Sequence, residues 1–350
     1  MKKQILVTGS AGLVGSESVK FFCTLGYQVH GIDNNMRATF FGNQASTRWN
    51  QISIQKAYKN YVHHTFDIRD EKPVQKLFKA HKFDLIIHTA AQPSHDWAAR
   101  EPLTDFSINA GATLSLLENY RKYCPEGTFI FTSTNKVYGD TPNSLPFIEQ
   151  PTRYELPKNH KFYKGINESM SLDNTLHSVF GASKVAADIM VQEYGKYFGL
   201  HTGIFRCGCI TGPAHSGTRL HGFLAYLVSS IAQGTPCTIY GYKGKQVRDN
   251  IHSFDLVNAF YHFYKHPKKG EVYNMGGGRH SNTSILEAIK EIEVLLHKKA
   301  KINIINKARL GDHEWYISDV SKFKKDYPKW KHQYNGHQIL KELCLFGHGL

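Results

Sequence analysis

The residues of this 350-residue chain that favour a definite chemistry begin with a glycine-rich loop and a carboxylate. Gly9, Gly12 and Gly15 lie between a short apolar run and a helical stretch. Glycines so placed permit a tight turn and let backbone N–H groups at a helix N-terminus approach a pyrophosphate. Asp33 ends the next apolar run, where its carboxylate can accept hydrogen bonds from ribose hydroxyls and would repel a 2′-phosphate. The pattern therefore predicts NAD rather than NADP, with Arg37 close behind as the one feature against it.

Two arginine-containing segments later in the chain could bind a second phosphorylated ligand. Arg248 and Arg309 lie in separate segments of the chain. Guanidinium groups match the oxygens of a diphosphate in a bidentate manner, and two of them would neutralise its charge. Surface ion pairing is the alternative, and the motifs favour diphosphate binding. The predicted substrate-binding residues, which include a clamp for a nucleotide base at 222–224, are Arg153, His221, Gly222, Phe223, Gln246, Arg248, Arg309 and Asp312.

A third candidate is the stretch from His177 to Lys184, which opens a helical pattern. Phe180 and Lys184 are one turn apart and share a helix face. A lysine ammonium so placed would lower the pKa of a neighbouring phenol, but the ring at position 180 carries no hydroxyl. The spacing therefore points to a reactive site with an unusual residue in it.

The elements that must position these residues alternate between strands and helices. Short apolar runs predict strands over 5–8, 28–32, 62–66, 85–88, 129–131 and 202–206, with helical stretches between them. This alternation is typical of an α/β fold with a Rossmann-type, doubly wound parallel sheet. No second glycine motif follows, so we expect a smaller C-terminal substrate-binding lobe.

The domain boundaries follow from the same pattern. We expect residues 1–200 to form an NAD-binding Rossmann domain and residues 201–350 to form mainly the substrate-binding lobe, with part of that segment returning to the Rossmann sheet. The connection from Tyr138 to Phe180 is longer than a plain loop. We expect its central part, residues 141–178, to be an insertion over the active site. Its candidate ligand contacts are Arg153 and Glu168, with solvated surface charges as the alternative.

The carboxyl ends of the predicted strands should supply the rest of the cofactor site, because ligands bind there in doubly wound sheets. Small residues after the strand at 85–88 would let a cofactor lie close over the sheet edge. The segment after 62–66 is placed to reach an adenine. The predicted cofactor-binding residues in these segments are Gly9, Ala11, Gly12, Leu13, Val14, Gly15, Asp33, Asn34, Asp67, Ile68, Thr89, Ala90, Ala91, Asn109 and Thr132.

Composition limits the remaining possibilities. The net charge of +14 suggests nucleic acid, but Lys and Arg are spread along the chain and phosphorylated ligands account for a basic protein, so no nucleic-acid partner is expected. No apolar run reaches the ~18 residues of a membrane span, and no signal region follows Met1, so we expect a cytoplasmic protein with no membrane partner. The six cysteines are scattered, which favours reduced thiols and no metal site.

Five motifs make the chain recognisable. They are Ser-Thr-Asn-Lys-Val-Tyr-Gly-Asp at 133–140, Thr-Arg-Tyr at 152–154, Gly-x-x-Glu-Ser at 165–169, Gly-Ala-Ser-Lys at 181–184 and Gly-Lys-Gln-Val-Arg-Asp at 244–249. Together with the glycine loop they span nearly the whole chain. The chain resembles the extended short-chain dehydrogenase/reductases that modify nucleotide-sugars, and more narrowly the CDP-tyvelose (CDP-paratose) 2-epimerases.

The resemblance implies an enzyme with a tightly held NAD that oxidises a sugar hydroxyl and returns the hydride to the opposite face of the ketone. Thr134, Phe180 and Lys184 then occupy the catalytic positions: Lys184 would hold the nicotinamide ribose, and Thr134 would donate a hydrogen bond to the ketone oxygen. The favoured reaction is C2 epimerisation of a CDP-linked hexose. The alternatives are another nucleotide-sugar epimerase or reductase, such as a 4-epimerase, and a non-catalytic protein that binds NAD or a nucleotide-sugar.

Phe180 is the departure that matters most. The superfamily carries tyrosine four residues before this lysine, and loss of a general acid/base costs about 10²–10⁴ in rate. Position 180 could be an engineered Tyr→Phe replacement that traps substrate. It could instead be natural, with proton transfer taken over by Lys184, by Thr134 through a water, or by His177 or Tyr138. A third explanation is a protein that binds nucleotide-sugar without turnover.

Neighbouring positions refine the reaction type and the assembly. The 4,6-dehydratases of the superfamily carry Asp and Glu after the threonine, whereas this chain has Asn135 and Lys136, which disfavours dehydration. Relatives commonly have Asn and Tyr where this chain has Cys209 and Thr211, so contacts at those two positions do not carry over. Relatives also pair through two long helices. The resemblance therefore implies a homodimer or a higher homo-oligomer, formed here by residues 112–122 and 183–197, with burial of these helices within the monomer as the alternative.

Overall fold

A computed structural model describes residues 2–215, 222–309 and 311–346, and the chain divides into two compact units. Unit 1 comprises Met1–Thr134, Val179–Arg206 and Leu256–Tyr273. Unit 2 comprises Asn135–Ser178, Cys207–Asp255 and Asn274–Leu350. The chain therefore passes between the units several times.

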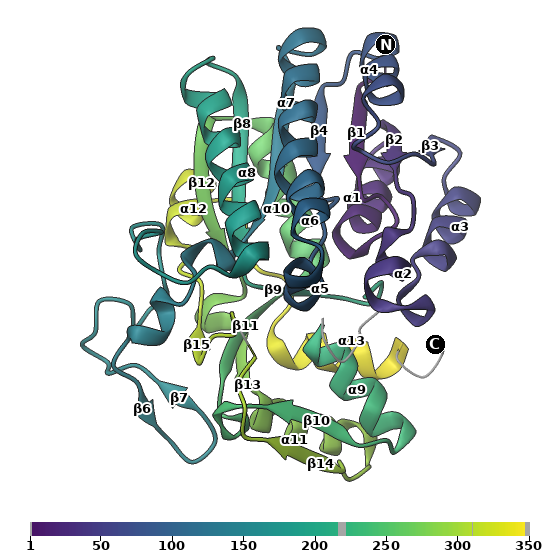
Figure 1. The fold of residues 1–350 in the computed structure, drawn as a ribbon. Helices are drawn as coiled ribbons and strands as arrows, with labels where there is room; N and C mark the ends of the chain where they lie inside the picture. Colours follow the sequence, from purple (N-terminus) through teal and green to yellow (C-terminus); the bar gives the residue numbers. More distant parts are fainter. Residues whose placement is uncertain (1, 216–221, 310, 347–350) are drawn as a thin grey trace. The chain divides into compact units, whose positions relative to one another are not determined.

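A seven-stranded sheet forms the centre of unit 1 (Figure 1), in the order β12-β8-β5-β4-β1-β2-β3. Strand β1 pairs in parallel with both β2 and β4, β2 pairs in parallel with β3, and β4 with β5. The chain thus builds outward from β1 in both directions, which confirms the predicted doubly wound, Rossmann-type sheet. The strands are β1 (Gln4–Thr8), β2 (Gln28–Ile32), β3 (Tyr61–His64), β4 (Leu85–His88), β5 (Thr128–Thr134), β8 (His201–Cys207) and β12 (Lys269–Met275).

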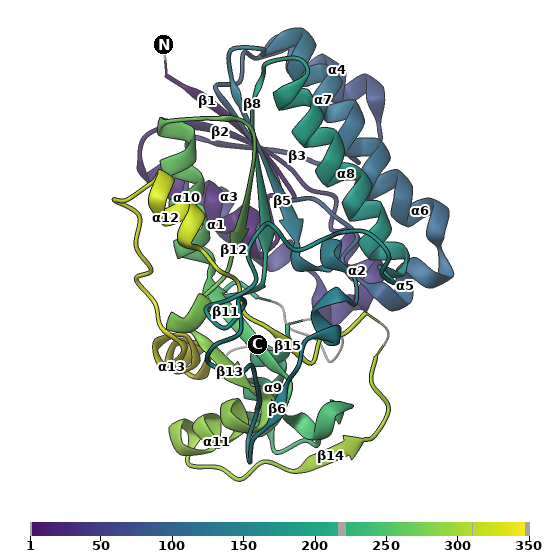
Figure 2. The ribbon, with the colours of Figure 1, turned by 90° about the vertical axis from the view of Figure 1, so that its left-hand side faces the viewer.

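Helices cover both faces of this sheet, as Figures 1 and 2 show from two directions. Ile5, Leu6 and Val7 of β1 are fully buried, as expected of a parallel strand covered on both sides. One face carries α4 (Glu71–Ala80), α7 (Ala112–Tyr123) and α8 (Ser178–Lys196), and the other carries α1 (Leu13–Thr24), α3 (Arg48–Ala57) and α10 (Ser253–Lys265). Within the described ranges, no helix is long and apolar enough to cross a membrane.

The segment from 38 to 60, which lies between the predicted strands 28–32 and 62–66, is largely helical. It contains the end of α2 (Met36–Phe41) and the whole of α3. Two asparagines fix this segment to the rest of unit 1: Asn35 Oδ1 accepts a bond from Thr47 N (2.9 Å), and Asn50 Nδ2 donates to Ala11 O (2.9 Å). Further along, α5 (His95–Arg100), α6 (Pro102–Phe106) and a π-helical turn (Ser107–Gly111) lead into α7.

Unit 2 has a separate apolar core, in which three helices pack on a two-stranded parallel sheet. These elements are α9 (Phe223–Gln233), α11 (Ile285–Leu296), α13 (Gly336–Phe346), β10 (Cys237–Tyr240) and β14 (Ile302–Ile305). A second sheet is formed by β9 (Cys209–Thr211), β11 (Val247–His252), β13 (Asn282–Ser284) and β15 (Trp315–Tyr316). Unit 2 also contains α12 (Ser321–Asp326) and the hairpin of β6 (Ile148–Glu149) and β7 (Tyr154–Glu155).

The long insertion belongs to unit 2, so the sequence segment 1–200 does not form one continuous unit. The reason is a set of bonds along the insertion. Asn143 Nδ2 donates to Asp312 O (2.9 Å), Tyr154 N donates to Lys245 O (3.0 Å), and Ile166 forms a parallel bridge with Ser318. That the insertion covers an active site stays a prediction.

A buried ion pair in unit 1 joins helix α8 to the sheet. Asp188 is fully buried and accepts two bonds from Arg206, through Nε (3.0 Å) and a terminal nitrogen (2.8 Å). Ser133 Oγ in β5 donates a third bond of 2.6 Å, and Gln192 donates a fourth of 2.8 Å. Because every polar atom of the carboxylate is engaged, this network fixes α8 over the end of β5.

We expect a Ser133→Ala variant to lose about 1.5–3 kcal/mol of unfolding free energy, the usual contribution of a hydrogen bond to a charged group. Urea denaturation measures this loss. The control is Ser144→Ala, because the Ser144 hydroxyl donates to Thr141 O at an exposed site and its removal should leave the midpoint unchanged. Equal midpoints for the Ser133→Ala variant and the parent would show that the network does not hold α8.

Candidate functional site

The glycine loop of unit 1 folds closely on itself. Gly9 adopts a left-handed φ of +69°, and its N–H donates to Ile32 O (2.8 Å). A Cβ on Gly15 would lie 2.0 Å from Gly9 O, and a Cβ on Gly9 would lie 2.8 Å from Ala90 N. Both positions therefore require glycine for the loop to close.

Gly12 differs from Gly9 and Gly15 because space is open beside it. Apart from its chain neighbours and its own helix, a Cβ there would meet only Gly9 O, at 3.3 Å. Gly12 is also the N-cap of α1, so the backbone N–H groups of Leu13 and Val14 open the helix next to this space. A concave loop at the N-terminus of a twelve-residue helix fits a pyrophosphate.

Asp33 ends β2 beside this loop. Its Oδ2 accepts a bond from Ala11 N (2.9 Å) and its Oδ1 accepts one from Asn35 N (2.8 Å). Each oxygen keeps a further lone pair, so the residue can still accept a bond from a ribose hydroxyl. Arg37, the feature that argued against NAD, lies 4.8 Å over the Phe41 ring in α2.

Asp67, in the segment predicted to reach an adenine, lies next to Asn34. Asn34 Nδ2 donates to Asp67 Oδ2 (3.0 Å), and Arg69 donates to both carboxylate oxygens, at 2.9 and 2.8 Å. Burial raises the pKa of Asp67, but the bonds from Arg69 outweigh it and leave that pKa below its usual value. Ile68, the next residue, is buried in the core of unit 1.

The segment after β4 lies against the glycine loop. Thr89 Oγ1 donates to Thr8 O (2.7 Å), and Ala90 N donates to Thr8 Oγ1 (3.2 Å). His88 is buried beneath, bonded through both ring nitrogens to the hydroxyls of Thr8 (2.7 Å) and Thr113 (2.9 Å). Burial and the nearby Lys184 lower the pKa of His88 to about 3, so the imidazole is neutral.

Lys184 is 4% exposed, and its Nζ donates to Thr132 O (2.9 Å) and lies 4.1 Å over the Phe131 ring. The ammonium is therefore held against β5, on the strand that ends in Thr134. Phe180 is 6% exposed, and its ring contacts His95 edge to face at 4.9 Å. The structure thus confines the aromatic ring but offers no hydroxyl at position 180.

Asn109, a predicted cofactor residue, has its side chain fully engaged by protein. Its Oδ1 accepts a bond from Gln92 N (2.9 Å), and its Nδ2 lies within 3.1 Å of Gln92 O, Asp105 Oδ1 and Ser183 Oγ. The π-helical turn that carries Asn109 directs it inward, as such turns often do near functional sites. Asn109 therefore positions Ser183, the neighbour of Lys184.

In unit 2, Lys136, Arg248 and Asp312 form a charged cluster. Arg248 is 7% exposed and donates to Asp312 Oδ1 (2.5 Å) and to its own neighbour, Val247 O (2.8 Å). Burial raises the pKa of Asp312, but Arg248 and Lys136 outweigh it and lower that pKa to about 2. Burial, together with the charges of Arg248 and Arg309, lowers the pKa of Lys136 to about 8, although Asp312 acts in the opposite direction.

His313 completes this cluster, and its hydrogen bonds show which of its ring nitrogens carries the proton. Its Nε2 lies 2.8 Å from Gly139 O and must carry the proton, because a carbonyl oxygen can only accept. Its Nδ1 is then an acceptor, 3.4 Å from Lys136 Nζ. Burial and the charges of Lys136 and Arg248 keep the pKa of His313 well below its usual value. The ring is therefore neutral and holds the lysine amine in place.

The other predicted substrate residues are less clearly grouped. Arg153 is bonded to Glu287 (3.2 Å) and Asn282 (2.5 Å), so its guanidinium is engaged by protein. Gln246 is 5% exposed, Gly222 is the left-handed N-cap of α9, and Phe223 packs on the core of unit 2. His221 lies outside the described residues. Substrate contact by any of them stays a prediction.

Two groups that could have replaced a tyrosine base are engaged elsewhere. The Tyr138 hydroxyl is buried and donates to Asn274 Oδ1 (2.7 Å). His177 Nε2 lies 2.9 Å from Val137 O. Glu168, the insertion's second candidate, accepts a bond from Asn274 N (2.6 Å). These bonds give the three residues structural roles.

Sequence reasoning missed the cluster around Lys136. The motif at 133–140 contains Lys136, but in the sequence this residue indicated only that dehydration is disfavoured. His313 follows Asp312 directly, yet a single histidine carries no signal in a chain with 20 of them. Only the fold shows that residues 136, 248 and 313 come together.

Comparison with known proteins decides the family. The model of the NAD dependent epimerase/dehydratase family matches residues 5–276. The chain belongs to this family. It is an enzyme of the extended short-chain dehydrogenase/reductase type, and the family's dependence on NAD confirms the cofactor prediction.

Individual members of the epimerase/dehydratase family show the range of reactions. The chain is 31% identical to a CDP-paratose 2-epimerase from Salmonella typhi over 91% of its length and 92% of the relative's. It is 28% identical to a dTDP-glucose 4,6-dehydratase from Salmonella typhimurium, over 84% and 76% of the two chains. A UDP-glucose 4-epimerase from Thermus thermophilus, solved with NAD, shares the fold with a TM-score of 0.79 at 22% identity, covering 99% of both chains.

Proposed function

We propose that this enzyme epimerises a CDP-linked hexose at C2 by transient oxidation to the ketone and return of the hydride. The observation that carries the proposal is Lys136, which stands where dehydratases of the superfamily have a carboxylic acid and lies in a cationic cluster with Arg248. Dehydratases of the superfamily use an Asp and a Glu at these two positions to eliminate water, and this chain has Asn135 and Lys136 in their place. The similarity to a CDP-paratose 2-epimerase supports the choice of nucleotide and carbon.

Unit 1 carries the residues that would hold NAD. The glycine loop and the start of α1 accommodate the pyrophosphate, Asp33 accepts bonds from the adenosine ribose, and Lys184 binds the nicotinamide ribose. When bound, NAD supplies the hydride acceptor and donor for the sugar carbon. Thr134, at the carboxyl end of β5, donates a hydrogen bond to the sugar oxygen.

Lys136 takes over the proton transfer that Phe180 cannot perform. Lys136 follows Thr134 by two residues, so chain connectivity keeps it close to the end of β5. As a neutral amine it accepts the proton of the sugar hydroxyl during oxidation and gives it back during reduction. A general base works best when its pKa lies near the operating pH, and burial brings that of Lys136 into this range.

The pH dependence of the rate follows from this role. A base must be deprotonated in the free enzyme, so kcat/KM should rise with pH and level off above about 8, the lowered pKa of Lys136. Rates of CDP-hexose epimerisation between pH 6 and 10 test this expectation. A rate that falls as pH passes through 8 would instead show that Lys136 acts as a fixed positive charge.

The proposal as a whole is tested on the purified protein. Denaturation should release NAD(H), and incubation with CDP-paratose or CDP-glucose should give a product inverted at C2 by NMR. Inversion at C4 would assign the enzyme to the 4-epimerases. Bound nucleotide-sugar recovered unchanged would mark a non-catalytic binding protein.

We also propose a homodimer formed through α7 and α8. Leu114 on α7 and Ile189 on α8 are each 40% exposed, and Tyr197 and Phe198 after α8 are 79% and 45% exposed. Large apolar side chains on two neighbouring helices suit a helical interface. Sedimentation velocity should give a dimer mass that an Ile189→Glu variant reduces to that of a monomer.

A further inference from the structure

Strand β14 of unit 2 leaves its isoleucines in solvent. Ile302, Ile304 and Ile305 are 44%, 47% and 36% exposed, and every residue from 301 to 308 is exposed. The apolar core of unit 2 includes Ile239 of the neighbouring strand β10, whereas the isoleucines of β14 lie outside it. Proteins usually protect an exposed strand with charged or bulky polar side chains, so an apolar one marks an interaction surface.

The outer edge of β14 carries backbone groups that can still form hydrogen bonds. Within the described part of the chain, β14 pairs with β10 alone. On this inner edge, Lys301 O and Ile305 O accept bonds of 2.7 and 2.8 Å from backbone N–H groups at the start of β10 and just after its end. Successive residues of a strand direct their backbone groups to alternate sides. Ile302 and Ile304 therefore direct their N–H and C=O groups away from β10, where a further strand can pair with them.

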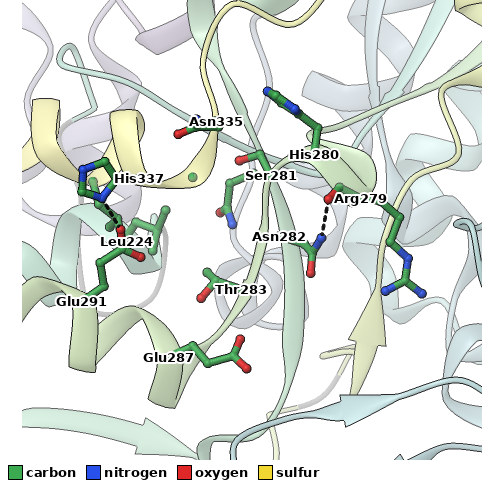
Figure 3. A pocket seen from close by; sticks show the side chains of 13 residues that line it. Leu224, Arg279, His280, Ser281, Asn282, Thr283, Glu287, Glu291, Asn335 and His337 are labelled. Carbon is green, nitrogen blue, oxygen red and sulfur yellow. Dashed lines mark hydrogen bonds and ion pairs between the residues drawn. The ribbon is translucent and has the colours of Figure 1, made fainter.

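This edge is separate from the pocket of about 410 Å³ that unit 2 also contains (Figure 3). The pocket is lined by the segment 279–283 and by side chains of α9, α11 and α13, such as Leu224, Glu291 and Leu340. None of the residues from 301 to 308 lines it. A partner on β14 would therefore be recognised along the strand and not enclosed in this cavity.

The charge around β14 favours an acidic partner. The segment 298–309 has no carboxylate and five cationic side chains, which are Lys298, Lys299, Lys301, Lys307 and Arg309. Glu293 neutralises one of these charges, because it lies 3.2 Å from Lys299. A second copy of the chain would bring the same cationic segment and a net charge of +14, so like charges would oppose self-association through this edge. Carboxylates on a partner would instead be attracted to it.

We propose that β14 is a docking edge for an extended, acidic peptide segment of another protein, which adds to the β10–β14 sheet as a third strand. The backbone groups of Ile302 and Ile304 pair with the peptide, and alternate apolar side chains of the peptide pack on these isoleucines. Carboxylates on either side of the apolar stretch meet Lys301 and Lys307. A membrane surface matches this edge less well, because lipid tails would leave the outward N–H and C=O groups without partners.

The probe is a fluorescein-labelled peptide of sequence Glu-Glu-Val-Thr-Val-Thr-Val-Glu-Glu, in which valine and threonine favour an extended strand. It is titrated into the full-length protein and followed by fluorescence anisotropy. We expect saturable binding that weakens as the salt concentration is raised, because the flanking carboxylates act through their charge. A peptide with glutamine in place of each glutamate should bind about tenfold more weakly.

An Ile304→Pro variant should bind the probe about tenfold more weakly, because proline removes an outward N–H that pairs with the peptide. The bonds between β14 and β10 do not use this N–H, so the variant should melt at the same temperature as the parent. Ile304→Val is the matched control, which keeps the N–H and the branched side chain and should bind as the parent does. If the proline variant melts lower, a double Ile302→Ser and Ile304→Ser variant removes the exposed apolar contacts alone and should also bind about tenfold more weakly.

Three results would overturn the proposal. The first is an absence of saturable binding, or equal binding by the parent and a folded Ile304→Pro variant. The second is a parent that dimerises in sedimentation velocity and an Ile304→Pro variant that does not, which would assign the edge to a second copy of the chain. The third is binding of the parent to phosphatidylserine vesicles that the double serine variant loses and the proline variant keeps, which would assign the isoleucines to a membrane surface.

Discussion

A Lys136→Met variant should epimerise a CDP-hexose about 10²–10⁴ times more slowly than the parent, the usual effect of removing a general base. Methionine matches the length of the lysine side chain and leaves the Arg248–Asp312 pair in place. The loss should appear in kcat, because Arg248 still provides positive charge for the diphosphate. Steady-state rates at pH 8 with product quantified by NMR measure the effect.

Two further variants separate proton transfer from charge. Lys136→Arg keeps the positive charge but cannot lose its proton, so it should be as slow as Lys136→Met. Adding Phe180→Tyr to Lys136→Met restores the hydroxyl that the superfamily carries and should recover part of the rate. If Lys136→Arg were as fast as the parent and Lys136→Met changed only KM, Lys136 would bind the diphosphate and would not be the base.

A Lys184→Met variant should lower kcat by about 10²–10³, which is typical of losing one preorganised electrostatic group. The ammonium of Lys184 is buried and held by Thr132 O, so solvent cannot replace its charge. Turnover assays and the NAD content of the purified variant measure the effect together.

Lys196→Met is the matched control, because Lys196 lies on the same helix, α8, but is exposed. It should keep the parent's rate and NAD content. A Lys184→Met variant with full turnover would show that Lys184 is not part of the active site. A slow variant with a normal melting temperature would exclude misfolding as the cause of the lost rate.

The cofactor half of the enzyme could be predicted from the sequence because its signals are local. The loop from Gly9 to Gly15 and the carboxylate at Asp33 belong to one strand-turn-helix-strand unit, and their order fixes their contacts. The strand at 85–88 was predicted with its observed bounds because an apolar run buried on both faces has few alternatives. Lys184 was also found, through its motif.

The substrate half could not be predicted in the same way because its contacts are long-range. Lys136, Arg248 and His313 are separated by more than sixty residues from one another, and no periodic pattern links them. Nor does the sequence show that residues 135–178 belong with the C-terminal lobe, since that depends on bonds such as Asn143 to Asp312. Arg153 was predicted as a ligand contact, yet the fold gives it Glu287 and Asn282 as partners.

The most direct test of hydride transfer at C2 uses a CDP-hexose deuterated at that carbon. With the purified protein and no added cofactor, the epimerised product should keep its deuterium at C2, because the hydride removed during oxidation is the one that returns. Mass spectrometry and ²H NMR measure the retention. Loss of deuterium to solvent, or a product inverted at another carbon with C2 untouched, would contradict the proposed reaction.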